Sequence, residues 1–160
     1  MTSRRPAMQI RAPISVGELI DKITILQIKL KRLDGPGAAN VAKELAVLNR
    51  AKSDAHLNEP KIAALIIQLK AVNVALWDIE DQIRQLEACG DFGPRFIETA
   101  RSVYKLNDRR AAIKRLINVA SGSDIIEEKS YRTDDDLRKK MRRDDFGCLT
   151  ASTYDPFPSS

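Results

Sequence analysis

Apolar residues recur at alternating spacings of three and four over several long stretches of this chain. Such spacing places them along one face of a helix and is typical of coiled-coil seams. A capping-box sequence at residues 15–18 predicts the start of the first helix, with the Ser15 side chain accepting from the Glu18 amide and the Glu18 carboxylate reaching back. Its seam contains Val16, Leu19, Ile23, Leu26, Leu30 and Leu33. The Asp-Gly-Pro-Gly sequence at 34–37 predicts the end of this helix.

Three further helices are predicted. The second runs from about Ala38 to Ser53, the third from Pro60 to just before Gly90, and the fourth from after Pro94 to about Ala120. Eight consecutive apolar positions form the seam of the third helix: Ile62, Leu65, Leu69, Val72, Leu76, Ile79, Ile83 and Leu86. A helix of roughly thirty residues is about 45 Å long. Because so long a helix rarely finds enough partners within one small domain, we expect the protein to form a homo-oligomer.

The fold class that follows is all-α, with antiparallel helical hairpins or a helical bundle and coiled-coil-like heptad seams. Short connections between successive helices favour antiparallel neighbours. A charged fraction of 31% and an aromatic fraction of 5% also favour helices over a sheet. We expect a flexible N-terminal segment at 1–14, a helical domain at 15–131 and a mostly disordered charged tail at 132–160.

Charge and cysteine content limit the possible partners. The net charge is +5, with basic residues gathered near both ends and aspartates interrupting the second group, so nucleic acid is not a favoured partner. Two distant cysteines and one histidine predict neither a metal site nor a disulfide framework, and no cofactor is predicted. The sequence contains no apolar signal core and no apolar run of transmembrane length, which predicts a cytoplasmic protein without a membrane span.

Polar residues interrupt the apolar stripes of three helices, at positions that should be at least half buried. They are Gln27 on the first helix, Asn73, Glu80 and Arg84 on the third, and Asn107, Arg110 and Lys114 on the fourth. Buried charge is costly unless it is paired and hydrogen-bonded. We therefore expect Glu80 to meet Arg110 or Lys114 across antiparallel helices, with the three amide side chains satisfying the remaining donors and acceptors.

Two interpretations of this polar network remain open. In the first, the network fixes helix register and partner choice, as polar seam residues do in coiled coils. In the second, it forms an anion pocket in which Arg110 and Lys114 are the cationic wall and Glu80 is their counter-charge. Neither a Gly-rich phosphate loop nor a histidine beside a base occurs, so the sequence does not favour an enzyme.

Four stretches together resemble an uncharacterised bacterial family, a domain of unknown function. They are PISVGELIDKITIL at 13–26, LWDIED at 76–81, RFIETARSVYKLND at 95–108 and SDIIEEKSY at 123–131. The resemblance covers about residues 13–131. It implies a bacterial protein and a connection with surface-polysaccharide or glycosyl-transfer processes.

The leading functional hypothesis is a non-enzymatic helical interaction or accessory protein, which is homo-oligomeric through the first or third helix and has an unidentified protein partner. The alternative is a binder or enzyme that holds an anionic metabolite between helices, at Arg110, Lys114 and Glu80, with Asn73, Asn107 and Gln27 positioning it. A ligand of this kind would stabilise the native state.

Overall fold

The structure, a computed structural model, describes residues 10–57 and 59–128. These residues form four helices: α1 (Val16–Arg32), α2 (Gly35–Asp54), α3 (Pro60–Ala88) and α4 (Pro94–Ser121). No strand occurs among them, so the prediction of an all-α fold is confirmed. The helices belong to the first of two compact units, Met1–Glu127 and Glu128–Ser160. The predicted tail at 132–160 lies outside the described residues.

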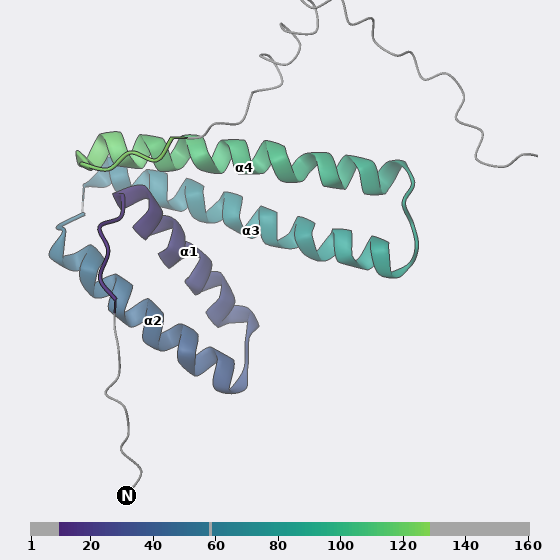
Figure 1. Cartoon of the computed structure of the whole chain (residues 1–160), viewed down its shortest axis with the longest axis horizontal. Helices are drawn as coiled ribbons and strands as arrows, with labels where there is room; N and C mark the ends of the chain where they lie inside the picture. The colour runs from purple at the N-terminus through teal and green to yellow at the C-terminus, as the bar shows by residue number, and fades with distance from the viewer. Residues whose placement is uncertain (1–9, 58, 129–160) are drawn as a thin grey trace, which may run out of the picture. The chain divides into compact units, whose positions relative to one another are not determined.

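Two helical hairpins make up the first unit (Figure 1). The long α3–α4 hairpin packs against α1, which in turn packs against α2. Among the described helices α2 touches α1 alone, and it has no fully buried residue. Helix α1 is therefore enclosed from several sides, whereas one side of α3 is left without a neighbouring helix.

The boundaries of α1 and α2 differ from the prediction. Helix α1 ends at Arg32, and Leu33 is extended and 40% exposed. Helix α2 begins at Gly35, three residues before the expected Ala38. The proline of the 34–37 sequence lies in the first turn of α2, where its missing N–H has no intrahelical partner to lose. The same short sequence therefore ends one helix and begins the next.

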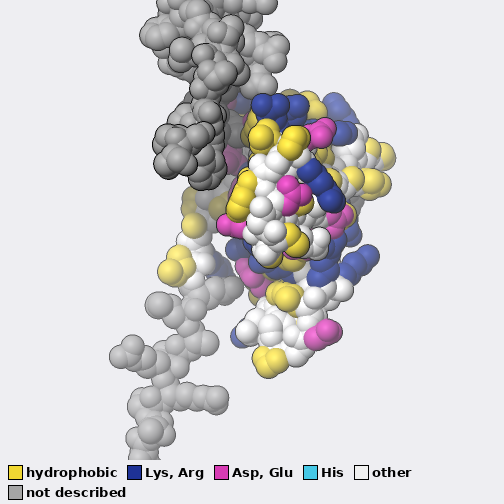
Figure 2. Space-filling model, turned by 90° about the vertical axis from the view of Figure 1, so that its right-hand side faces the viewer, with side chains coloured by type: hydrophobic (Ala, Val, Ile, Leu, Met, Phe, Trp, Pro, Cys, Tyr) yellow, Lys and Arg dark blue, Asp and Glu magenta, His cyan; other side chains and the backbone are white. Residues whose placement is uncertain are grey.

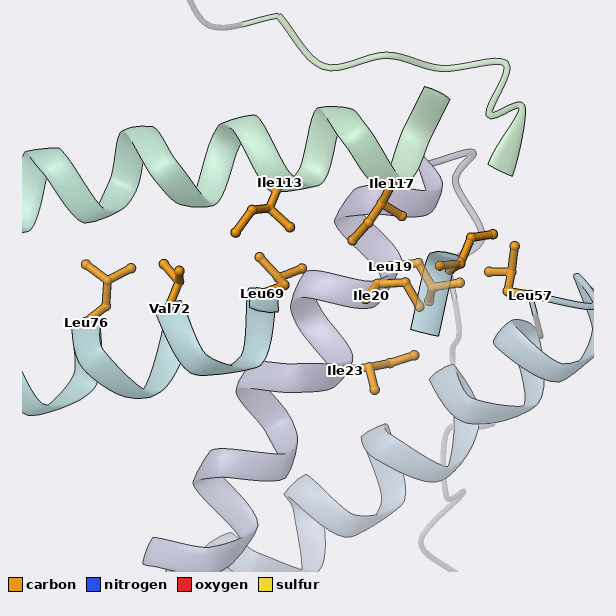
Figure 3. Packing of buried hydrophobic residues seen from close by; sticks show 10 residues of the cluster. Leu19, Ile20, Ile23, Leu57, Leu69, Val72, Leu76, Ile113 and Ile117 are labelled. Atoms are coloured by element: carbon orange, nitrogen blue, oxygen red, sulfur yellow. The ribbon is translucent and has the colours of Figure 1, made fainter. Parts of the chain in front are cut away.

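The hydrophobic core lies where α1 meets the α3–α4 hairpin (Figure 3). It consists of Leu19, Ile20, Ile23, Leu57, Ile62, Leu69, Val72, Leu76, Ile113 and Ile117. Seam positions of α1 and α3 supply most of it, whereas Leu30 and Leu33 at the end of the first seam are exposed. Coiled-coil pairing along the seams stays a prediction.

Helix α3 is also the one described helix that is long and apolar enough, by length and composition, to cross a membrane. An 18-residue window of this helix has a mean hydropathy of 1.6, and 28% of the window is buried. The absence of a membrane span thus stays a prediction. Most of this window of α3 is therefore not fully buried by the other described helices.

Candidate functional site

A buried ion pair joins α1 to α4 at the centre of the helical unit. The Asp21 side chain of α1 is 2% exposed. Its Oδ1 accepts hydrogen bonds from Nε of Arg110 at 2.9 Å and from Nδ2 of Asn73 at 2.8 Å, and its Oδ2 accepts from Nη2 of Arg110 at 2.5 Å. Nδ2 of Asn73 also donates to the Thr24 hydroxyl at 2.8 Å. We call these four residues the Asp21 cluster.

The position of Asp21 follows from the packing of α1 on more than one side. Asp21 lies two residues beyond the seam position Leu19, about 200° around the helix. That second face of α1 also carries Gly17, Thr24 and Ile28, and all of its members are buried. The hydrogen bond to Asp21 raises the pKa of Arg110, even though burial acts in the opposite direction. The contact with Asp21 therefore favours the charged form of the Arg110 guanidinium.

Lys114 binds two carboxylates from different parts of the chain. Its Nζ donates to Oε2 of Glu18 at 2.6 Å and to Oε2 of Glu127 at 2.5 Å. Burial alone would lower the pKa of Lys114, but the hydrogen bonds to Glu127 and Glu18 outweigh it, so the pKa is raised. The hydrogen bond to Lys114 lowers the pKa of Glu127. This Lys114 clamp ties the segment after α4 to α1.

The predicted capping box is correct in one half only. The Ser15 hydroxyl accepts from the Glu18 amide at 3.1 Å, as expected. The Glu18 carboxylate, however, binds Lys114 in place of the Ser15 amide.

Two further backbone amides in the first turn of α1 donate hydrogen bonds to side chains near the end of α4. Oδ1 of Asn118 accepts from Gly17 at 2.6 Å, and the Ser123 hydroxyl accepts from Val16 at 3.2 Å. A Cβ at Gly17 would lie 2.6 Å from the Lys114 carbonyl oxygen, so only glycine permits this approach.

A pocket of about 250 Å³ opens beside the Asp21 cluster. It is lined by Ile25 of α1, by Asn73, Leu76, Trp77, Glu80, Asp81 and Arg84 of α3, and by Asn107 and Arg110 of α4. Four of the six residues predicted as a site meet here: Asn73, Glu80, Asn107 and Arg110. An apolar wall beside a few convergent polar groups is the usual composition of a small-molecule site.

The two remaining predicted residues lie elsewhere. Lys114 belongs to its clamp, and Gln27 accepts from Nζ of Lys70 at 2.7 Å outside the pocket lining. The expected pairing of Glu80 with Arg110 or Lys114 is wrong, because Asp21 and Glu18 of α1 supply the counter-charges. Oε2 of Glu80 instead lies 3.7 Å from Nη2 of Arg84 on its own helix.

Sequence reasoning missed the acidic partners of both cations. Asp21 could have been found from α1 itself, since isoleucines at 20, 25 and 28 lie outside the seam and indicate a helix that is buried on more than one side. Glu127 carries no such signal, because the sequence after α4 has no periodic pattern that would predict its contact with Lys114. Among the described residues, no group of three or more His, Cys, Asp and Glu side chains is placed to hold a metal ion.

A family model described as a family of unknown function, DUF6165, matches residues 10–151. The chain belongs to this family. The match covers all four helices of this DUF6165 chain, the Asp21 cluster, the Lys114 clamp and the pocket. It confirms the resemblance to an uncharacterised family and extends it past residue 131, where the resemblance was expected to end. No curated protein and no solved structure matches the chain.

Proposed function

We propose that this DUF6165 chain is a helical interaction module that self-associates through the uncovered side of α3. That side carries a row of apolar residues spaced by three and four: Ala64, Ile67, Ala71 and Val74. Ile67 is 71% exposed, both alanines are exposed and Val74 is half-buried. Single exposed apolar residues are common, but a continuous row on a helix of this hydropathy is typical of an interaction surface. We call this row the outer α3 face.

The occupant that fits this face best is a second copy of the chain in antiparallel orientation. The first half of α3 is basic and the second half is mainly acidic. The charged residues are Lys61 and Lys70, followed by Asp78, Glu80, Asp81, Arg84 and Glu87. A two-fold axis at Ala71 brings each basic half beside the acidic half of the other copy, and the small side chains allow the two backbones to approach closely.

The charged ends of α3 then lie within reach of each other. With the axis at Ala71, Lys61 of one copy lies level with Asp81, and about 4.5 Å along the axis from Asp78, of the other. Arg32 of α1 already pairs with both aspartates, yet their side chains remain 59% and 47% exposed. They can therefore accept a further cation at the rim of the interface.

A lipid bilayer is the competing occupant, and the charges of α4 act against it. Helix α4 packs along α3 and carries exposed charged residues along its length, among them Arg101, Lys105 and Arg109. Inserting α3 would bring these charges into hydrocarbon, at a cost of several kcal/mol for each (~2.5–3.5 kcal/mol at mid-membrane). The face shown in Figure 2 likewise mixes hydrophobic, basic and acidic side chains. A protein surface is the better match.

The test is the molar mass by light scattering over a wide range of protein concentration. We expect the mass to rise from 17.9 kDa towards twice that value. Ile67→Glu should weaken association at least about a hundredfold, since a buried isoleucine contributes about 1.5–3 kcal/mol on each side of the axis and each 1.4 kcal/mol is tenfold. Val47→Glu is the control, because Val47 is 45% exposed on α2 and distant from the outer α3 face.

Two results would refute self-association. One is a mass that stays at 17.9 kDa at every concentration. The other is flotation with phosphatidylcholine vesicles that Ile67→Glu abolishes and Val47→Glu does not, which would assign the outer α3 face to lipid.

The finer assignments belong to the same proposal and rest on the family resemblance. They are a bacterial, cytoplasmic setting and an accessory role near surface-polysaccharide or glycosyl-transfer processes. Affinity capture from the native host with the wild type and with Ile67→Glu tests them. Recovery of a glycosyl-transfer protein by the wild type supports the role, and recovery of this chain alone counts against it.

A further inference from the structure

The cations that were expected to bind an anion are already occupied. Two of the three guanidinium nitrogens of Arg110, Nε and Nη2, donate to Asp21. Lys114 is bound by two carboxylates and does not line the pocket. An anionic ligand would therefore face a guanidinium whose charge Asp21 already balances.

Two amide side chains of the pocket lining offer hydrogen-bond acceptors. Nδ2 of Asn73 donates to Asp21 and Thr24, so its Oδ1 is the atom that the Asp21 cluster does not use. Nδ2 of Asn107 donates to the carbonyl oxygen of Val103 at 3.1 Å on its own helix, which leaves Oδ1 as its acceptor. Two amide oxygens are thus available on adjoining walls of the pocket.

The charged groups around this space form pairs of opposite sign. Asp21 binds Arg110, Asp81 lies 3.6 Å from Arg32, and Glu80 lies near Arg84. Glu80 is only loosely held, since its Oε2 lies beyond hydrogen-bond distance of Arg84, at 3.7 Å, and both side chains are at least half exposed. Exposed pairs of this kind contribute little, so Glu80 can exchange its partner for a ligand.

We propose that this pocket binds a small primary amine with an apolar body. An ammonium group has three donors and no acceptor. Its donors suit the carboxylate of Glu80, and the amide oxygens of Asn73 and Asn107 are further acceptors in the same pocket lining. The apolar body fits against Leu76 and Trp77, together with Ile25 of α1. A volume of about 250 Å³ equals about eight waters at 30 Å³ each, which selects a small molecule over a peptide segment.

The single tryptophan of the chain makes this binding directly observable. Trp77 lines the pocket, so its indole N–H resonance in the ¹⁵N-labelled full chain reports on occupancy. Three probes share one aromatic body and differ in the head group: phenethylamine, phenethyl alcohol and phenylacetate. We expect phenethylamine to shift the resonance in a saturable way, the alcohol to bind about tenfold more weakly, and phenylacetate to leave the resonance unchanged.

The Glu80→Gln variant tests the assigned counter-charge. It should weaken phenethylamine binding about tenfold or more and leave the affinity for phenethyl alcohol unchanged, since only the ammonium loses a charge-assisted partner. Glu87→Gln is the matched control, because Glu87 is an exposed residue of α3 outside the pocket lining.

Three outcomes would overturn the proposal. Tighter binding of phenylacetate would restore the anion pocket predicted from the sequence. A Trp77 resonance that no probe shifts would mean that the pocket binds none of these ligands. Equal weakening by Glu80→Gln and Glu87→Gln would show a general effect of charge in place of a contact with Glu80. The four residues of the outer α3 face do not line the pocket, so these probes and the Ile67→Glu variant test separate surfaces.

Discussion

Replacing Arg110 by alanine would leave the Asp21 carboxylate buried without its counter-charge. Asp21 would keep one of its three accepted hydrogen bonds, from Asn73 at 2.8 Å, and would lose both that come from Arg110. Removing one partner of a buried pair costs about 3–5 kcal/mol. The Arg110 side chain is 28% exposed, so water can enter part of the space that it leaves. We therefore expect the free energy of unfolding to fall by about 3 kcal/mol.

Removing the other partner should cost less. In Asp21→Asn the guanidinium of Arg110 can still reach water and an amide oxygen, so we expect a loss of about 1–2 kcal/mol. The double variant Asp21→Asn/Arg110→Ala should be more stable than Arg110→Ala alone, because no uncompensated buried charge remains. Such a recovery is the signature of an ion pair and is not expected from simple loss of packing.

Urea unfolding followed by circular dichroism measures these differences, at one fixed protein concentration because the proposed self-association would change the apparent stability. Arg109→Ala, which removes an exposed arginine one position earlier, is the control.

The reasoning fails if Arg110→Ala and Arg109→Ala lower stability equally. It also fails if the double variant is as unstable as the sum of the two single variants.

Two further predictions concern the end of α4. Gly17→Ala should lower the free energy of unfolding by about 1–3 kcal/mol, because its Cβ would lie 2.6 Å from the Lys114 carbonyl oxygen. Gly37→Ala is the control and should not destabilise, since a Cβ there would have nothing within 4 Å. Equal melting temperatures of the two variants in thermal unfolding would contradict this prediction. The lowered pKa of Glu127 means that its contact with Lys114 stabilises above the ordinary value of 4.5 and is lost as the pH falls through the folded pKa. Glu127→Gln should therefore lower stability at neutral pH and have no effect at strongly acid pH, and a pH-independent difference would contradict this.

The helices were predictable because their apolar positions repeat over long stretches, and periodic burial dominates weaker local signals. The boundary between α1 and α2 was less predictable, since glycine and proline serve both to stop a helix and to start one. Here Asp34 is the N-cap residue and Pro36 lies in the first turn, so the turn is shorter than expected.

The polar network was predictable by residue but not by partner. Projection of α4 correctly placed Arg110 and Lys114 on its buried side. Their partners depend on which helix lies opposite, and a single seam for α1 does not reveal that its second face is also buried. Glu80 was assigned to the interior from the α3 stripe, but its side chain is 51% exposed and lines a pocket.

The contact between the first turn of α1 and residues at the end of α4 has a consequence for synthesis on the ribosome. The acceptors for the amides of Gly17 and Val16 lie 101 and 107 residues downstream. The α1–α2 and α3–α4 hairpins can each close soon after they emerge, because their contacts are local. The first turn of α1 is completed only after Asn118 and Ser123 have been added. The nascent chain thus carries an unfinished first turn of α1 until the four helices are almost fully translated.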